Sequence, residues 1–366
     1  RQKTQLFKKI LIANRGEIAC RIIRTCHALG IQTVAVYSDA DVNSLHVRDA
    51  DEAVRIGPPP AAESYLNIQA VMDAAKQTNS EAIHPGYGFL SESSDFVAAC
   101  HSANITFIGP SNELMEMMKD KAEARRLAGE AGLPLLPGTE GDVDDKEALS
   151  RALEIGFPVM VKASQGGGGI GIRMVSTPDE MPAALSRARS LGKSAFGSSD
   201  IYIEKFLEGP SHVEVQVIAD HYGNSVHLYE RDCSIQRRNQ KVIEETPTSK
   251  IGRRRRNRMY EAALTLVKHI GYTNAGTIEF LVDNEENFYF LEMNTRLQVE
   301  HPVTEMITGL DMVELQIRIA AGESLPFSQK EVERQGHHDG DVLGRRRVLS
   351  VRCSMLETRR LRCFPD

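Results

Sequence analysis

Two glutamates, Glu279 and Glu292, lie within apolar segments that predict adjacent strands of one hairpin. A four-residue polar loop between the segments 276–283 and 288–294 would make Asp283 oppose the first residue of the second strand. The same register places the two glutamates opposite each other. Opposed Cβ atoms lie roughly 4.5 to 5.5 Å apart, where like charges destabilise the pair unless a cation lies between them. Oxygen ligands suit Mg²⁺ or Mn²⁺, so the hairpin predicts a metal site, with two solvated glutamates as the alternative.

Polar and apolar residues alternate from Glu292 onward. Strand side chains alternate with period two, so an extended chain would place five polar side chains on one face: Glu292, Asn294, Arg296, Gln298 and Glu300. Arginine can hold a small planar oxyanion through two hydrogen bonds while a nearby carboxylate accepts its proton. This face therefore predicts an anion-activating site; the alternative is alternation for solubility alone.

A glycine-rich segment, 164–171, joins two predicted strands, 157–163 and 172–175. Consecutive glycines let backbone N–H groups approach an anion, and a hairpin can cover it as a lid. Lys162, at the end of the first strand, is placed to meet phosphate oxygens. The alternative is a flexible turn, and a P-loop is excluded because its first glycine would fall at Arg187.

The first hundred or so residues must form the support, because strands and helices alternate there. Predicted strands and one amphipathic helix cover 9–13, 17–29, 33–37, 81–84 and 105–108. This order predicts a parallel, doubly wound α/β sheet. The first turn, 13–17, lacks the Gly-x-Gly-x-x-Gly of dinucleotide-binding folds, which argues against a nicotinamide or flavin dehydrogenase. The turn-rich segment 84–92 predicts a tight loop at the carboxyl edge of the sheet.

Composition indicates a globular protein with two or three domains. The chain has 366 residues, 41% of them apolar, and a formal net charge of −6, which argues against generic nucleic-acid binding. It contains no apolar stretch long enough to cross a membrane, and its six cysteines lack Cys-x-x-Cys spacing, which favours a reducing compartment. The run 253–256, four arginines, predicts a solvated helix start. Arg1 in place of an initiator Met suggests a trimmed precursor or a fragment.

The segment from Glu292 to Glu305 resembles, residue for residue, the signature of biotin carboxylases. Residues 14–19, 84–92 and 231–238 are also similar to that family, so the resemblance extends from about residue 7 to about residue 337. It implies a Rossmann-like N-terminal (pre-ATP-grasp) domain, 1–118, and an ATP-grasp domain, 119–330, with a glycine-rich lid at about 134–206. The segment 331–366 would be what remains of a largely missing C-terminal domain.

The resemblance also implies the ligand-binding residues. ATP would be held by Lys121, Lys162, Gly166, Gly167, Gly168, Gly169, Glu204, Lys205, Leu207, His212 and Gln236. Glu279, Glu292 and Asn294 would bind Mg²⁺ or Mn²⁺, with two ions expected. Bicarbonate would be held by Lys241, Arg296, Gln298, Val299 and Glu300. Glu300 matches the base that deprotonates bicarbonate, and Arg296 the residue that steadies the anions.

In the reaction that the resemblance implies, bicarbonate attacks the γ-phosphate of ATP to give carboxyphosphate, and biotin on a separate carrier captures the CO₂. A carboxyltransferase subunit would select the acyl-CoA, and a homodimer is expected. The likeness is greatest to the biotin-containing α subunits of methylcrotonoyl-CoA carboxylases, with the propionyl-CoA and acetyl-CoA types as alternatives. The location would be the mitochondrial matrix in a eukaryote and the cytoplasm in a bacterium.

Four features depart from the family pattern. Asn239 replaces a histidine, and Ile170 replaces a basic residue of the lid. The arginine-rich segment 338–366 matches no family pattern, so we expect a frameshift or an alternative exon and disorder there. No Ala-Met-Lys-Met site for biotin attachment is present. The alternatives are therefore an active biotin carboxylase and an ATP-binding but catalytically impaired subunit; a carbamoyl-phosphate-type ligase is disfavoured by the segment from Glu292 to Glu305.

Overall fold

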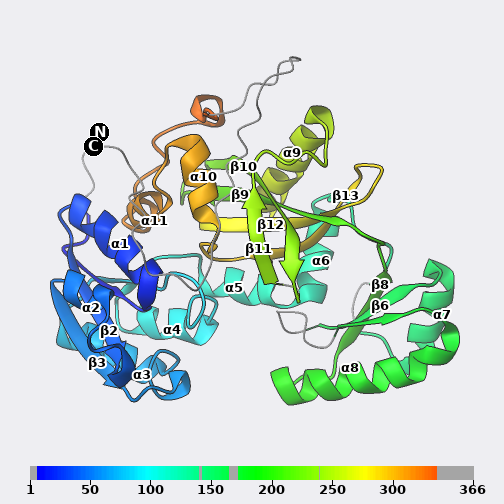
Figure 1. The fold of residues 1–366 in the computed structure, drawn as a ribbon, viewed down its shortest axis with the longest axis horizontal. Coiled ribbons are helices and arrows are strands. Elements are labelled where there is room, and N and C mark those ends of the chain that lie inside the picture. Colours follow the sequence, from blue (N-terminus) through cyan, green and yellow to red (C-terminus); the bar gives the residue numbers. More distant parts are fainter. Residues whose placement is uncertain (1–5, 140–141, 165–171, 239, 336–366) are drawn as a thin grey trace.

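The computed structural model describes residues 6–139, 142–164, 172–238 and 240–335. Within these ranges the chain forms an N-terminal α/β domain, a central antiparallel sheet with helices, and a smaller lid on the far side of that sheet (Figure 1). No helix in the described ranges is both long and apolar enough to span a bilayer. The glycines of the lid, Asn239 and the segment 338–366, with its predicted disorder, lie outside the described residues.

The N-terminal domain is built on a five-stranded parallel sheet of order β3-β2-β1-β4-β5, which confirms the predicted α/β architecture. Its strands are β1 (Lys9–Ile12), β2 (Gln32–Ser38), β3 (Glu52–Gly57), β4 (Ala82–His84) and β5 (Thr106–Phe107). Its helices are α1 (Gly16–Ala28), α2 (Leu45–Asp49), α3 (Ile68–Gln77), α4 (Ser94–Ser102) and α5 (Asn112–Lys119). In α1, Ile18, Ile22 and Cys26 recur every four residues, so one helical face is buried.

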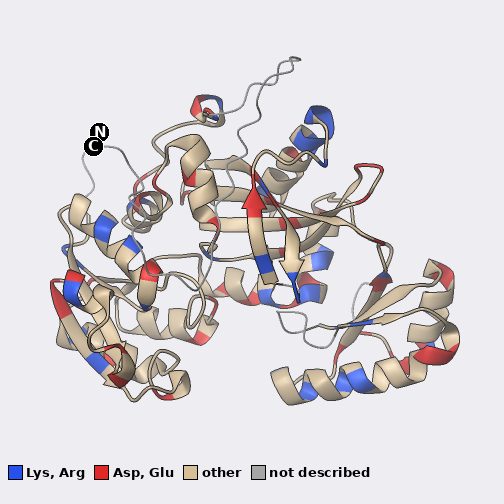
Figure 2. Ribbon diagram, viewed as in Figure 1, with Lys and Arg blue, Asp and Glu red and all other residues tan. Residues whose placement is uncertain are grey.

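The central sheet is antiparallel, with the order β11-β10-β9-β12-β13. Its strands are β9 (Ser211–Ala219), β10 (Ser225–Arg237), β11 (Gln240–Glu245), β12 (Asn274–Val282) and β13 (Phe288–Asn294). The helices of this part are α6 (Lys121–Glu130), α9 (Arg253–His269), α10 (His301–Thr308) and α11 (Met312–Ala320). Helix α9 begins with the predicted arginine run (Figure 2), but Arg256 is not solvated: it is buried, with Nη1 3.3 Å from Glu230 Oε1.

The lid is a three-stranded antiparallel sheet of order β7-β6-β8 packed against two helices. Its elements are α7 (Asp145–Ile155), β6 (Val159–Ala163), β7 (Ile172–Val175), α8 (Met181–Phe196) and β8 (Ile201–Lys205). The predicted hairpin around the glycine-rich segment is confirmed, since β6 pairs with β7 from Lys162 opposite Ile172 to Val159 opposite Val175. The buried apolar residues of the lid all come from 143–203, so the lid has a core of its own.

The predicted β12–β13 hairpin is present, and Glu279 does oppose Glu292. The predicted register at its loop is wrong, because Val282 and not Asp283 opposes Phe288. Asp283 belongs to the turn instead: its Oδ1 accepts hydrogen bonds from loop N–H groups at 285 and 287, over 2.9 and 2.8 Å. A β-bulge next to Glu279 restores the predicted pairing, since the extra residue in the loop is offset by an extra residue in β13.

Candidate active site

A row of charged residues crosses four neighbouring strands of the central sheet. Arg231 on β10 is paired with Glu214 on β9, which is paired with Glu279 on β12, which in turn is paired with Glu292 on β13. Glu214 and Arg231 are 0% exposed and Glu279 is 3% exposed. Like charges on opposed strand positions repel, so a row of three glutamates needs cations between or beside them.

Lys241 on β11 supplies one of these cations. Its Nζ lies 2.7 Å from Glu279 Oε1 and 2.7 Å from Glu300 Oε1, and it also contacts Glu214. Arg231 Nε donates to Glu214 Oε1 over 2.6 Å. Three carboxylates from β9, β12 and the residue before α10 therefore converge on one ammonium group, which is what brings these distant segments of the chain together.

The surroundings shift the pKa values of these carboxyl groups in different directions. Burial alone would raise the pKa values of Glu214 and Glu279, but the Lys241 ammonium holds both below the usual range. Arg231 assists at Glu214, and His212, whose Nε2 lies 2.9 Å from Glu279 Oε2, assists at Glu279. In Glu300, burial and then the neighbouring Glu214 raise the pKa above its usual value despite Lys241. A buried carboxylate of raised basicity suits a proton acceptor.

The polar residues after β13 converge by a different route from the predicted extended strand. Strand β13 ends at Asn294, and the chain turns before α10. Asn294 Nδ2 donates to Glu279 Oε1 over 2.8 Å, and Arg296 Nη1 donates to Gln298 Oε1 over 2.7 Å. The intervening side chains at 293, 295 and 297 are buried, so packing anchors this segment although it is not a strand.

Arg296 also connects the site to the N-terminal domain, since its Nε donates to Glu92 Oε2 over 2.8 Å. Glu92 is the last residue of the turn-rich loop, which leaves the carboxyl end of β4 as predicted. Asn14 holds this loop against the first turn by donating through Nδ2 to the carbonyls of Pro85 and Tyr87, both over 2.8 Å. Gly86 has a φ of +63°, and a Cβ there would lie 3.0 Å from the Asn14 amide, so glycine suits this close approach.

Two of the residues that the family resemblance assigns to ATP lie where the lid meets the central sheet. Lys121 Nζ lies 3.1 Å from Glu292 Oε2, and its backbone N–H donates to the carbonyl of Ser164 over 3.0 Å. Lys162 forms a buried ion pair with Glu204 across β6 and β8. Each lysine is thus held by a glutamate that the resemblance also assigns to the site, one as a metal ligand and one as an ATP contact.

The other assigned ATP residues are more scattered. Lys205 Nζ donates to the carbonyls of Gly156 and Phe157 over 2.8 and 3.2 Å, at the base of the lid. Leu207 is half-buried just after β8, and Gln236 lies opposite Lys241 on the β10–β11 pair. Val299 is half-buried between Gln298 and Glu300. The glycines assigned to the lid lie outside the described residues: Gly166, Gly167, Gly168 and Gly169.

The donor set around Glu279 fits a divalent cation. Side-chain ligand atoms of His212, Glu214 and Glu279 all lie within 4.8 Å of one another, and Glu292 and Asn294 occupy adjoining positions on β13. Carboxylate and amide oxygens suit Mg²⁺ or Mn²⁺. Lys241 and Lys121 contact the same carboxylates, so a bound cation would share them with two ammonium groups.

Sequence reasoning did not identify Glu214 or the site role of Arg231. The signal for Glu214 was present, since His212, Glu214 and Gln216 alternate with three valines and therefore occupy one face of a strand. That pattern ordinarily indicates a solvated face, whereas here Glu214 and Gln216 are both 0% exposed. Only the contacts made by α10, through Thr304, and by Lys241 of the edge strand β11 show that this face is the interior of a site.

The lid, the antiparallel sheet and the buried row of carboxylates define the class of ATP-grasp ligases. The model for the biotin carboxylase N-terminal domain matches residues 6–115, and that for the ATP-binding domain of the carbamoyl-phosphate synthase L chain matches residues 120–328. A biotin carboxylase of Halalkalibacterium halodurans is 55% identical over 333 residues, which are 91% of this chain and 74% of that protein. The chain belongs to the biotin carboxylase family, whose members are ATP-dependent ligases.

Other relatives are longer than this chain. The mitochondrial α subunit of methylcrotonoyl-CoA carboxylase from Oryza sativa is 54% identical, over 90% of this chain and 45% of that protein. Among solved structures, the biotin carboxylase from Campylobacter jejuni, in a complex with an ATP analogue, has a TM-score of 0.88 at 48% identity, covering 90% of this chain and 74% of that one. The biotin carboxylase domain of Hydrogenobacter thermophilus 2-oxoglutarate carboxylase, in a complex with MgADP, ADP and bicarbonate, has a TM-score of 0.87 at 50% identity, covering 91% and 73%.

Proposed function

We propose that this chain catalyses the ATP- and bicarbonate-dependent carboxylation of biotin as the biotin carboxylase component of an acyl-CoA carboxylase. The observation that carries the proposal is the convergence of Glu214, Glu279 and Glu300 on the Lys241 ammonium, beside Arg296. Bicarbonate bound in the related Hydrogenobacter domain supports an anion site in this fold. The reaction is inferred from the family to which the chain belongs, and the buried charged residues are the groups that would perform it.

In this proposal Arg296, Gln298, Val299 and Lys241 hold bicarbonate beside Glu300. Glu300 accepts the hydroxyl proton as a bicarbonate oxygen forms a bond to the γ-phosphorus of ATP, and the bond from that phosphorus to the ADP oxygen breaks. The raised pKa of Glu300 makes its carboxylate a better proton acceptor than an ordinary glutamate. Carboxyphosphate then breaks into CO₂ and inorganic phosphate. The ureido nitrogen of biotin on a separate carrier gives its proton to that phosphate as it forms a bond to the carbon of CO₂.

The nucleotide would lie between the lid and the central sheet, near Lys121, Lys162, Glu204 and His212. Glu279, Glu292 and Asn294 would hold Mg²⁺ or Mn²⁺, which neutralises charge on the transferring phosphoryl group when bound. The two lysines would exchange their present glutamate partners for phosphate oxygens. Such an exchange keeps each ammonium paired while the nucleotide is bound.

The carboxylase is proposed to be of the methylcrotonoyl-CoA type, with a biotinylated carrier, a carboxyltransferase subunit and a second copy of the chain as partners. The 54% identity to three plant subunits of that type supports this, while a propionyl-CoA carboxylase chain at 52% keeps the alternative open. The mitochondrial plant relatives support a matrix location if the source is a eukaryote, and the bacterial relatives a cytoplasmic one otherwise. We place the first domain boundary near 118, at the end of α5 and just before α6.

A second candidate function is an ATP-binding subunit with impaired catalysis. The observation that favours it lies in the sequence: Asn239 stands where the family has a histidine, two residues before Lys241. An asparagine can donate hydrogen bonds but cannot become cationic. This candidate predicts nucleotide binding without turnover.

The deciding experiment measures ADP release by the purified chain with MgATP and bicarbonate, with and without free biotin. The first proposal predicts biotin-stimulated release that falls by about 100-fold or more in Glu300→Gln, because a general base is removed with little change of shape. Glu154→Gln, which neutralises an exposed carboxylate on the lid paired with Arg151, is the matched control and should keep full activity. ATP-analogue binding without biotin-stimulated turnover in the native chain would instead favour the second candidate.

A further inference from the structure

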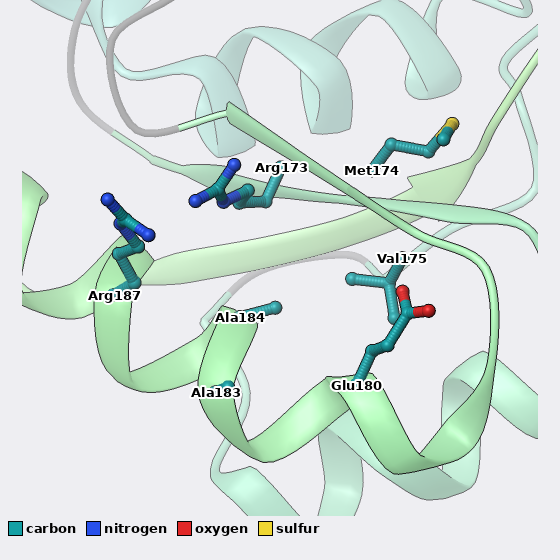
Figure 3. A pocket seen from close by; sticks show the side chains of 7 residues that line it. All are labelled: Arg173, Met174, Val175, Glu180, Ala183, Ala184 and Arg187. Atoms are coloured by element: carbon teal, nitrogen blue, oxygen red, sulfur yellow. The ribbon is translucent and has the colours of Figure 1, made fainter.

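A small pocket lies between the edge strand β7 and helix α8 of the lid, with a volume of about 250 Å³ (Figure 3). Seven residues line it: Arg173, Met174, Val175, Glu180, Ala183, Ala184 and Arg187. Residues three and four apart share a helical face, so the two alanines and Arg187 follow one side of α8, and Glu180 is the residue just before that helix. The small alanine side chains leave the space that makes the pocket.

The two arginines of this pocket are uncompensated. The guanidinium group of neither Arg173 nor Arg187 forms a hydrogen bond or ion pair with any of the residues described by the structure, and both side chains are exposed. Their neighbour Arg189, also on α8, lies 3.4 Å from Asp142 and 3.2 Å from Asp145 and donates to two backbone carbonyls. Two like charges lining one pocket repel each other, and an anion between them would remove that repulsion.

The pocket is separate from the proposed nucleotide site. Arg173 is paired directly with Val161 on β6, so their side chains lie on the same face of the lid sheet, and Val161 is buried in the lid core. Lys162, the next residue, therefore faces the opposite side, where it pairs with Glu204. The β-sheet of the lid lies between the two sites.

Charge and size restrict the occupant. Figure 3 shows the two guanidinium groups at one end of the pocket and the carboxylate of Glu180 beside Val175 at the other, while the Met174 side chain points away from α8. Glu180 is fixed there, since its Oε2 accepts a hydrogen bond from the Ser176 N–H over 3.0 Å. Guanidinium groups bind phosphate oxygens through paired, charge-assisted hydrogen bonds. A second anionic group at the other end would meet Glu180 and be repelled.

We propose that this lid arginine pocket binds the phosphate group of a small phosphate monoester. Arg173 and Arg187 hold the phosphate, and a short carbon chain lies against Ala183 and Ala184. The volume is below the roughly 300 to 1,000 Å³ typical of pockets for drug-sized ligands, so the ligand is small. This site goes beyond the proposed carboxylation and needs none of its residues.

The test is a phosphorus NMR titration of inorganic phosphate with the full chain, in the presence of Mg²⁺ and a saturating non-hydrolysable ATP analogue that fills the catalytic site. Arg173→Gln and Arg187→Gln should each weaken phosphate binding about tenfold, because each removes one charged hydrogen-bonding partner. Arg151→Gln makes the same charge change on α7 of the lid, away from the pocket, and should leave the affinity unchanged. Arg187→Lys keeps the charge and should retain part of the affinity.

Unchanged phosphate affinity in both glutamine variants would overturn the proposal, as would loss of phosphate binding by the native chain when the ATP analogue is added. Acetate binding as tightly as phosphate would overturn the assignment to a phosphate group. Because both side chains are exposed, the variants should keep the melting temperature of the native chain. None of these outcomes depends on biotin carboxylation, so failure of the proposed function leaves this test intact.

Discussion

The buried side chain of Arg231 should contribute more to stability than any exposed arginine of this chain. Its Nε donates to Glu214 Oε1 over 2.6 Å, and its Nη1 donates to Gln216 Oε1 and Thr304 Oγ1, both over 2.8 Å. Its Nη2 donates to Thr277 Oγ1 over 3.3 Å, and the side chain has no solvent exposure. Arg231→Met keeps much of the volume but leaves a buried carboxylate and several polar groups without this partner.

The magnitude follows from what remains in the variant. Removing one partner of a buried ion pair typically costs about 3–5 kcal/mol, because the remaining charge stays desolvated. Lys241 still contacts Glu214 in Arg231→Met, so we expect a loss at the lower end, about 3 kcal/mol of unfolding free energy. Adding Glu214→Gln removes the stranded charge and should recover part of this loss.

The assay is urea unfolding followed by circular dichroism, since the chain has no tryptophan. The matched control is Arg126→Met, because Arg126 is 46% exposed and pairs with Glu123 and Glu130 on the surface of α6. Exposed pairs of this kind contribute less than about 1 kcal/mol. A midpoint shift for Arg231→Met no larger than that of the control would refute the reasoning.

Three further predictions concern charge at buried or half-buried positions. The raised pKa of Glu300 should make bicarbonate-dependent ADP release fall at a pH above 4.5, the ordinary glutamate value, as the pH is lowered; release that falls only at or below pH 4.5 would contradict this. Burial, then Glu300 and Glu214, raise the pKa of Glu244 to about 7, so the folded chain binds an extra proton between about pH 4.5 and 7 and loses stability as the pH rises through that window. In urea titrations, the unfolding free energy of Glu244→Gln should therefore rise relative to that of the native chain by up to about 3 kcal/mol as the pH rises through this window. A difference between the two chains that does not change with pH would contradict this prediction. Arg21→Ala should lower the unfolding free energy by about 2 kcal/mol in the same assay, because Arg21 Nη2 lies 2.9 Å from Asp311 Oδ1 at the contact of α1 with α11. A loss below about 0.5 kcal/mol would count against this prediction.

The sequence was informative wherever local pattern and burial agree. Alternating strands and helices predicted the parallel sheet, and the glycine-rich segment marked the β6–β7 hairpin. The opposition of Glu279 and Glu292 was also predicted, but from an incorrect loop register that the β-bulge offsets. A bulge cannot be located from residue types alone when both faces of a strand are largely buried, because no alternation records the slipped residue.

The site itself depends on contacts between distant segments, which periodicity does not report. Local pattern led to an extended strand through Glu300, yet β13 ends at Asn294. Lys241 and Glu300 meet because β11 is the edge strand of the sheet and the residue before α10 lies against the same face, so that Lys241 Nζ is 2.7 Å from Glu300 Oε1. Glu214 was overlooked for the same reason, since a polar residue alternating with valines resembles one on a solvated face until the covering elements are known.

The distribution of buried apolar residues determines which parts of this chain could be exchanged between relatives as a block. The lid draws its core from 143–203 alone, so a lid transplanted from another family member would bring its own interior with it. The N-terminal domain differs, because Ile10, Ile18 and Ile22 share one core with Leu297 and Met312 near the other end of the described chain. A chimaera joined near residue 118 would therefore build this shared core from two different parent proteins. Such a chimaera should fold only when both parents have matching side chains in that core.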